Sequence, residues 1–340
     1  MAAHPRGCPP NCIKPHLLPA MTIYPDPALL HPSSITPEIH QRNAQIAKAM
    51  AALPEWWVIG PPAFRKNQRE GAGVFPPVIF SERATTRTIE SEAGPLRLRE
   101  FLPSTGKPRG VYLHLHGGGW VIGGADMQDS MLLTLADHAQ VAVLSVHYRL
   151  APEHRYPAAP DDCETAALWL LDHCAAIYGA EQLIIGGESA GSHLSAVTLL
   201  RLRQRLGFCP FSGANFNFGL FDMTLTPSAR AFGDERLFLR TIDMLQFRDA
   251  FLPGEHDLRD PDISPLYGDL QNLCPALFTI GTRDALLDDS LFMHARWLAA
   301  GNTGQLDVYP GAPHAFFRLA DAHTQSAMTQ QIQFICSLLK

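Results

Sequence analysis

The sequence of 340 residues lacks the features of several protein classes. It holds no apolar run near the about 18 residues of a membrane-spanning helix, and no hydrophobic segment typical of a secretion signal stands near its start. It also lacks a dense run of Lys or Arg, and its formal net charge is -6. A nucleic-acid or anionic-membrane partner therefore has no electrostatic support, and we expect a cytoplasmic protein without a membrane span.

Cysteines are few, with seven scattered along the chain in no regular spacing. This odd number predicts no disulfide framework and fits a reducing compartment. Cys8 and Cys12, with His4 and His16 close by, could be read as a metal site, but their spacing matches no zinc-binding pattern. Residues 1–20 are rich in Pro, His and Cys, and we expect them to form a disordered leader.

Short apolar segments alternate with longer segments of helical pattern from about residue 85 onward. This alternation predicts an α/β fold in which a mostly parallel sheet is covered by helices on both faces. The first two strands, separated by a Gly-Pro turn, are expected to form an antiparallel hairpin. The expected strands are 85–90, 96–102, 111–116, 141–147, 183–187, 214–220, 276–281 and 305–309. The expected helices are 126–139, 161–178, 190–206, 287–300 and a last one from about 321.

Two segments fall outside this alternation. Thr36-Pro37 is typical of a helix start, and the apolar face of the helix that follows either packs on the rest of the protein or lines a substrate entrance. The long segment 221–269 has helical content but no convincing strand, so both segments could cap the carboxyl edge of the sheet, where such sheets bind ligands. The expected division is a leader (1–20), N-terminal cap helices (21–80), an α/β core (81–220 and 270–340) and a cap insertion (221–269).

The pentapeptide Gly187-Glu188-Ser189-Ala190-Gly191 stands between an expected strand and an expected helix. A nucleophile at such a tight strand-to-helix turn needs small residues two positions before and after it, which gives the pattern G-x-S-x-G. The pentapeptide alone occurs by chance, but this context indicates that Ser189 is a nucleophile at a helix N-terminus, where negative charge is favoured.

Three consecutive glycines form the second motif, His116-Gly117-Gly118-Gly119-Trp120, directly after an expected core strand. Glycines expose backbone N–H groups, so the loop can donate hydrogen bonds to an oxyanion. A phosphate cradle is the rival interpretation, but neither nucleotide-binding glycine pattern is present. A plain flexible turn is the other, although it would not need this composition.

An acid and a base follow the serine in the order that this kind of fold requires. Asp284 comes just after the strand 276–281, and His314 comes after the strand 305–309. Loops after parallel strands converge on one edge of a sheet, so we expect both side chains to meet the serine there. Asp288 and Asp289 are expected in the next helix and His323 in the last one, which makes them weaker candidates.

Taken together, these motifs resemble those of the hormone-sensitive-lipase-like (family IV) bacterial carboxylesterases, members of the α/β-hydrolase superfamily. The resemblance covers about residues 85–340 and is carried by His116–Trp120, Tyr148–His154, Gly187–Gly191, Asp284–Asp288 and Gly311–His314. It implies an α/β-hydrolase fold with an eight-stranded sheet, a helical cap, and hydrolysis of esters with short to medium acyl chains. It also implies a small-molecule ester as substrate and no cofactor, and it makes a homodimer an expectation. His114, His116 and His147 fall at strand ends and could suggest a metal site, but they belong to different strands, so we expect no metal.

The resemblance also implies roles for particular residues. Gly117, Gly118 and Ala190 would supply the oxyanion N–H groups, with His116, Gly119, Trp120 and Glu188 as supporting residues of the two motifs. The segment 148–154 would be a structural brace that uses an Arg149–Glu153 pair.

This sequence departs from the family pattern at two places. Glu188 replaces the commoner Asp, and we expect it to accept hydrogen bonds near the serine. Ser192-His193 replaces a usual Gly-Asn. The same triad serves amidases, thioesterases and lactonases, and some relatives of this fold only bind ligands, so these functions stay open at this point.

Overall fold

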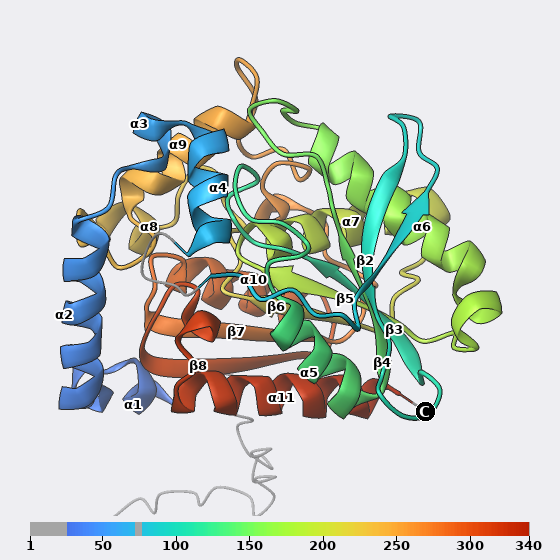
Figure 1. Cartoon of the computed structure of the whole chain (residues 1–340). Helices are drawn as coiled ribbons and strands as arrows, with labels where there is room; N and C mark the ends of the chain where they lie inside the picture. Colours follow the sequence, from blue (N-terminus) through green and yellow to red (C-terminus); the bar gives the residue numbers. More distant parts are fainter. Residues whose placement is uncertain (1–25, 72–76, 340) are drawn as a thin grey trace, which may run out of the picture.

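The computed structural model describes residues 26–71 and 77–339, and it is built around one eight-stranded sheet (Figure 1). The strand order is β1-β2-β4-β3-β5-β6-β7-β8, and β2 runs antiparallel to both of its neighbours while the pairs from β4 to β8 are parallel. The strands are β1 (Thr85–Ile89), β2 (Leu96–Phe101), β3 (Gly110–Leu115), β4 (Val141–Val146), β5 (Leu183–Glu188), β6 (Gly213–Asn217), β7 (Ala276–Arg283) and β8 (Gly304–Pro313). The predicted sheet, including its hairpin, is confirmed. The predicted leader lies outside the described residues.

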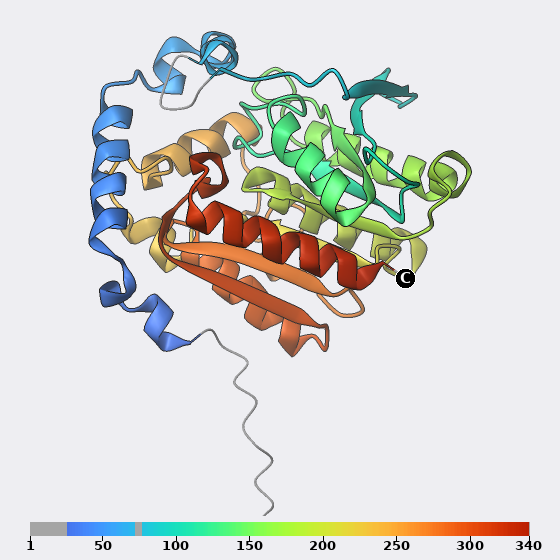
Figure 2. The ribbon, with the colours of Figure 1, turned by 60° about the horizontal axis from the view of Figure 1, so that its bottom comes forward.

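Helices cover both faces of the sheet (Figure 2). One face carries α6 (Ala158–Tyr178), α7 (Ala190–Leu206) and α10 (Leu287–Ala299), and the other carries α5 (Asp129–Ala139) and α11 (Ala322–Leu338). Asp288 and Asp289 lie in α10 and His323 lies in α11, as predicted.

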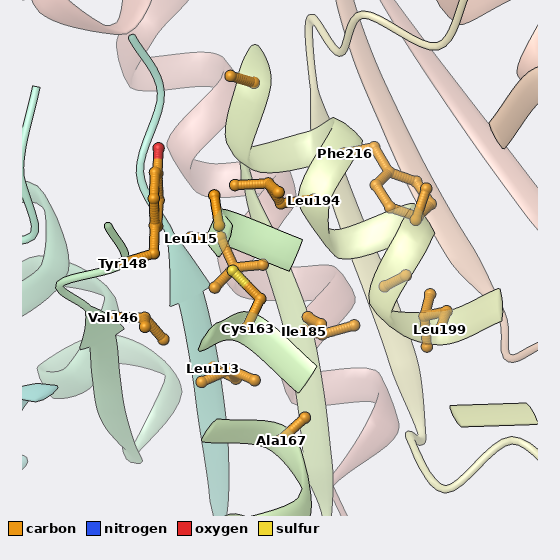
Figure 3. Packing of buried hydrophobic residues seen from close by; sticks show 14 of the residues in the cluster. Leu113, Leu115, Val146, Tyr148, Cys163, Ala167, Ile185, Leu194, Leu199 and Phe216 are labelled. Carbon is orange, nitrogen blue, oxygen red and sulfur yellow. The ribbon is translucent and has the colours of Figure 1, made fainter. Parts of the chain in front are cut away.

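Every residue of the central strands β3, β4 and β5 is buried, because helices pack on both of their faces. Successive side chains of β3 alternate between two cores, with Leu113 in one and Tyr112 in the other. Figure 3 shows Leu113 and Ile185 of the strands together with Cys163 of α6 and Leu194 of α7. Burying one such leucine stabilises the fold by roughly 1.5–3 kcal/mol, so this layer holds the strand ends, and the site at them, in place.

The remaining helices lie outside this layered core, and α3, α4, α8 and α9 gather in the same region of the molecule (Figure 1). The N-terminal elements are α1 (Pro27–Leu30), η1 (Pro32–Ser34), α2 (Pro37–Ala51), α3 (Trp56–Ile59) and α4 (Pro61–Glu70). The later ones are α8 (Pro227–Ala231), α9 (Thr241–Phe251), η2 (Pro265–Tyr267) and η3 (Phe316–Leu319). Thr36 caps α2 with its side-chain oxygen, as predicted, whereas the sequence pattern did not single out α4. Among the described helices, none is long and apolar enough to cross a membrane.

Candidate active site

Ser189 stands on the sharp turn between β5 and α7, with φ 54° and ψ −116°. Its N–H donates to the carbonyl oxygen of Asn217 at 2.9 Å, which ties the turn to β6. A Cβ atom on Gly187 or on Gly191 would lie 2.0 or 1.8 Å from the carbonyl oxygen of Leu115. Any larger residue at either position would therefore collide with β3, which is the steric reason for the glycines of the pentapeptide.

The structure brings Ser189, His314 and Asp284 together at the carboxyl edge of the sheet. The Nε2 atom of His314 lies 2.9 Å from the Oγ atom of Ser189, and its Nδ1 atom lies 3.0 and 2.9 Å from the two carboxylate oxygens of Asp284. His314 and Asp284 are only 6% and 3% exposed. The N–H of Leu286 donates to Oδ1 of Asp284 at 2.9 Å and holds the carboxylate toward the imidazole. An imidazole placed in this way can take a proton from the serine hydroxyl.

The glycine loop lies against the serine turn. A Cβ atom on Gly117 would come within 2.8 Å of the carbonyl oxygen of Glu188, and one on Gly118, whose φ is +120°, within 2.1 Å of that of Ile122. In the described part of the chain, the N–H groups of Gly117, Gly118 and Ala190 take part in none of the hydrogen bonds of loops or side chains. They therefore remain free to hold an anion beside Ser189, as oxyanion donors do.

A cavity of about 250 Å³ opens onto these groups and is lined by Ser189, His314 and the glycine loop. Its walls come from the N-terminal helices and from the segment after β6. The apolar wall residues include Met50, Ile59 and Phe64 from the first and Phe238, Met244 and Phe247 from the second. Both roles considered for the helix that starts at Thr36 fit, since α2 packs on β8 and Met50 of α2 also lines the cavity.

A family model described as the alpha/beta hydrolase fold matches residues 112–318, which is more than half of the chain. The chain belongs to the α/β-hydrolase family.

Named relatives of this hydrolase refine that assignment. The carboxylic ester hydrolase LipN of Mycobacterium tuberculosis is 31% identical over 264 residues, which span 76% of this chain and 70% of LipN. An ethyl acetate hydrolase of Pseudomonas putida is 33% identical over 61% of this chain and 66% of its own. Among solved structures, an esterase of the bacterial hormone-sensitive lipase family has a TM-score of 0.77 and 27% identity, covering 90% of this chain and 99% of its own. The resemblance seen in the motifs is thus confirmed.

His314 is positioned partly by the N-terminal helices. β8 continues past its predicted end to Pro313, so His314 follows the strand directly. Gly311 in this extension donates its N–H to Thr282 Oγ1 at 2.8 Å and accepts a hydrogen bond from Asn43 of α2 at 2.8 Å. The ring of Phe218 lies 5.2 Å from the imidazole. Sequence reasoning missed Asn43, because 268 residues separate it from its partner.

Trp120, the last residue of the glycine motif, is held by His193 and Phe251. Its φ of 61° lies in the left-handed region, which costs a residue other than glycine free energy. Its indole N–H donates to Nδ1 of His193 at 3.2 Å, and Nε2 of His193 donates to the carbonyl of Ile263 at 2.9 Å. The indole also stacks on Phe251 at 4.7 Å. Burial lowers the pKa of His193 to about 4, so the imidazole stays neutral and its Nδ1 can accept. The only sequence signal for this contact was the departure at residues 192–193.

Glu188 accepts hydrogen bonds beside the serine, as predicted. Its Oε2 atom accepts from Nε2 of His114 at 3.0 Å and from the side-chain amide of Gln128 at 3.2 Å. Because the carboxylate of Glu188 accepts, His114 carries a proton on Nε2, and its Nδ1 lies 2.7 Å from the hydroxyl oxygen of Ser145.

His116 and Tyr148 hold the start of the glycine loop in place. Its Nδ1 donates to the carbonyl of Gly117 at 2.8 Å, and its ring stacks on Tyr148 at 4.1 Å. Tyr148 donates its hydroxyl to the carbonyl of His116 at 2.6 Å. Burial lowers the pKa of His116 to about 3, so the ring is neutral at working pH. Across residues 26–71 and 77–339, no group of three or more His, Cys, Asp or Glu side chains could hold a metal ion; the pair Cys8 and Cys12 lies outside the described residues.

The predicted Arg149–Glu153 pair is wrong. Arg149 binds Asp162 of α6 at 2.9 Å, while Glu153 binds Arg65 of α4 at 2.9 Å. Arg65 also donates from Nε to the carbonyl of Val121 at 2.7 Å. The segment 148–154 is not a helix, so a spacing of four residues does not bring its side chains together, and each charge finds a partner on another helix.

Asp289 anchors the segment after β6. It is fully buried and accepts from the N–H groups of Phe221 and Asp222 at 2.6 and 3.0 Å and from the hydroxyl of Thr226 at 2.7 Å. One carboxylate on α10 therefore fixes the start of the chain segment that walls the cavity.

Proposed function

We propose that this hydrolase is a serine carboxylesterase that cleaves esters with short to medium acyl chains through an acyl-enzyme. The proposal rests on the hydrogen bonds that join Ser189, His314 and Asp284 in series, beside free backbone N–H groups in one cavity. The names of its relatives, a carboxylic ester hydrolase and an ethyl acetate hydrolase, support ester bonds as the target.

In the first half of the reaction, Nε2 of His314 takes the hydroxyl proton as Oγ of Ser189 attacks the ester carbonyl. Asp284 keeps the other ring proton on Nδ1 and stabilises the imidazolium that forms. The N–H groups of Gly117, Gly118 and Ala190 hold the carbonyl oxygen as it becomes negative, and one such donor typically contributes about 3–4 kcal/mol.

In the second half, the tetrahedral intermediate expels the alcohol, which takes its proton from Nε2 of His314. A water molecule then gives a proton to the same nitrogen and attacks the acyl group on Ser189. The second tetrahedral intermediate then breaks its bond to Oγ of Ser189, and Oγ takes the proton back from Nε2 of His314. The products are a carboxylic acid and free enzyme, and the cycle needs no cofactor.

The size and polarity of the cavity support the acyl range. About 250 Å³ is slightly below the usual range of ligand pockets, which is about 300 to 1,000 Å³. The apolar side chains from both predicted cap segments favour an aliphatic chain over a strongly hydrated one. The division into a cap and a core, the cytoplasmic location and the homodimer stay predictions.

Replacement of the nucleophile tests the proposal. Ser189→Ala should lower kcat for p-nitrophenyl butyrate by on the order of 10⁶, on the precedent of serine proteases. A fluorophosphonate probe should label the wild type at Ser189 and leave the variant unlabelled. Retention of more than about a tenth of the activity by a folded Ser189→Ala variant would refute the assignment. Matched amides and thioesters of the same acid distinguish an esterase from the other users of this triad.

A further inference from the structure

Among the described residues that line the cavity, one carries a carboxylate, and the proposed reaction does not use it. Glu188 precedes Ser189 and lines the same cavity, and its side chain is only 8% exposed. A charge removed from water to this extent needs partners that compensate the lost hydration.

Only one of its two oxygens has such partners in the described residues. Oε2 accepts from His114 and Gln128, whereas no described group donates to Oε1. Some described side-chain oxygen and nitrogen atoms are fully buried without a hydrogen-bond partner, but Oε1 of Glu188 is not one of them. The side chain keeps 8% of its surface exposed, and the cavity is the space that Glu188 lines, so the unpartnered oxygen is the atom that a bound molecule would meet.

The carboxylate is held in a fixed orientation. His114 cannot swing away easily, because Ser145 binds its other nitrogen at 2.7 Å and both side chains are fully buried. Glutamate also reaches one methylene further than the Asp that is commoner in the family. An anchored carboxylate whose second oxygen is open to a cavity is a preorganised hydrogen-bond acceptor for a bound molecule.

The surroundings favour a cation as the donor. The aromatic rings of Phe64, Phe218 and Phe247 line the cavity, and ring faces attract ammonium groups. A hydrogen bond between an ionised donor and a carboxylate is about twice as strong as one between neutral groups. Arg318 also lies on the lining and has the opposite charge, so the experiment includes an anion for comparison.

We propose that Glu188 binds a protonated amino group of the substrate through Oε1, so that esters carrying an ammonium group near the scissile bond are preferred. The inference depends on the proposed esterase function and narrows its substrate class. The ammonium group can belong to the alcohol or to the acyl part, and both arrangements are tested.

Isosteric esters provide the test. On the alcohol side, the dimethylaminoethyl and isopentyl esters of butyric acid differ by N–H⁺ against C–H. On the acyl side, the methyl ester of γ-(dimethylamino)butyric acid is compared with its carbon isostere and with monomethyl glutarate, an anion. We expect the wild type to prefer the ammonium ester over its neutral isostere by about tenfold in kcat/KM in at least one pair. A ratio near one in both pairs, or a preference for the anion, would overturn the inference.

Variants at residue 188 connect that ratio to the carboxylate. Glu188→Gln keeps the shape and loses the charge, so the ratio should fall to near one, whatever happens to the rate with neutral esters. Glu188→Asp keeps the charge and should retain part of the preference for the ammonium ester. It replaces Glu188→Gln as the test variant if Glu188→Gln does not fold. Glu90→Gln removes an exposed carboxylate at the end of β1 and should keep the wild-type ratio. An unchanged ratio in folded Glu188→Gln would contradict the proposed site.

The two proposals fail in different ways. Turnover of neutral esters with no ammonium preference would leave the esterase function standing and reject the role of Glu188. If no ester is hydrolysed, calorimetric titration with dimethylaminoethanol still tests the site, since binding weakened by Glu188→Gln supports it and equal or absent binding rejects it.

Discussion

Loss of the indole N–H of Trp120 should damage catalysis more than binding. Trp120→Phe keeps an aromatic ring against Phe251 but removes the donor to Nδ1 of His193. Trp120 and His193 are 1% and 0% exposed, so water does not readily replace the lost bond. The residue that the bond restrains directly follows Gly119 of the glycine loop, and it has a φ of 61° that an unrestrained tryptophan would tend to leave.

The expected magnitudes follow from these contacts. An unsatisfied buried acceptor costs about 1–3 kcal/mol, so the free energy of unfolding should fall by roughly that amount. Complete loss of one oxyanion donor lowers kcat by about 10²–10³, which is an upper bound for a loop that is displaced but present. We therefore expect kcat to fall about tenfold, with KM within about twofold of the wild type.

The assay combines steady-state kinetics on one p-nitrophenyl ester with inhibition by a boronic acid, which mimics the tetrahedral intermediate. His193→Leu should resemble Trp120→Phe in kcat, and the double variant should have a kcat little below that of either one, because both remove the contact with the indole. His193→Leu should be the less stable of the two, since it also leaves the carbonyl of Ile263 without its donor. His193→Asn offers an oxygen near the place of Nδ1 and should retain most of the activity. Wild-type kcat and inhibitor affinity in a destabilised Trp120→Phe would refute this reasoning.

Two further predictions concern stability. Asp289→Ala leaves three buried donors without an acceptor and should lower the free energy of unfolding, measured in urea, by about 3 kcal/mol or more. Asp289→Asn keeps Oδ1 for the two backbone N–H groups and should lower it by about half as much. Equal losses of stability in the two variants would contradict this account. The buried His193 takes up its proton only near pH 4, while in the unfolded chain it does so near 6.5. Its contribution to stability is therefore complete above pH 6.5 and is lost as the pH falls toward 4, by up to about 3 kcal/mol. His193→Asn should show a smaller loss between pH 7 and 5 than the wild type, and equal slopes would count against the assignment.

Local sequence patterns predict most of this fold, because its core strands are short, apolar on both faces and separated by helices. The strand ends are less predictable, since they depend on contacts with neighbouring strands. Phe218 adopts a positive φ and ends β6 at Asn217, short of the predicted end. Pairing of Pro313 with Arg283 extends β8 beyond its predicted end.

The candidate site divides in the same way. The serine turn and the glycine loop are continuous motifs whose steric requirements can be read from five residues each. The contacts that orient them join distant segments, as Asn43 with Gly311 and His193 with Trp120 do. No spacing rule relates such pairs, and the wrong Arg149–Glu153 pair shows the limit of choosing partners by nearness in sequence.

The contacts of Arg65 have a consequence for anyone who recombines this protein with its relatives. The arginine stands on α4, in the part of the chain that matches the family least, yet it donates to the carbonyls of Val121 and Ala151 beside the glycine loop. A chimera that imports another N-terminal segment to broaden the range of substrates would also exchange a support of the candidate active site. Such grafts should be designed with Arg65 and its acceptors transferred as one unit, or turnover will change along with selectivity.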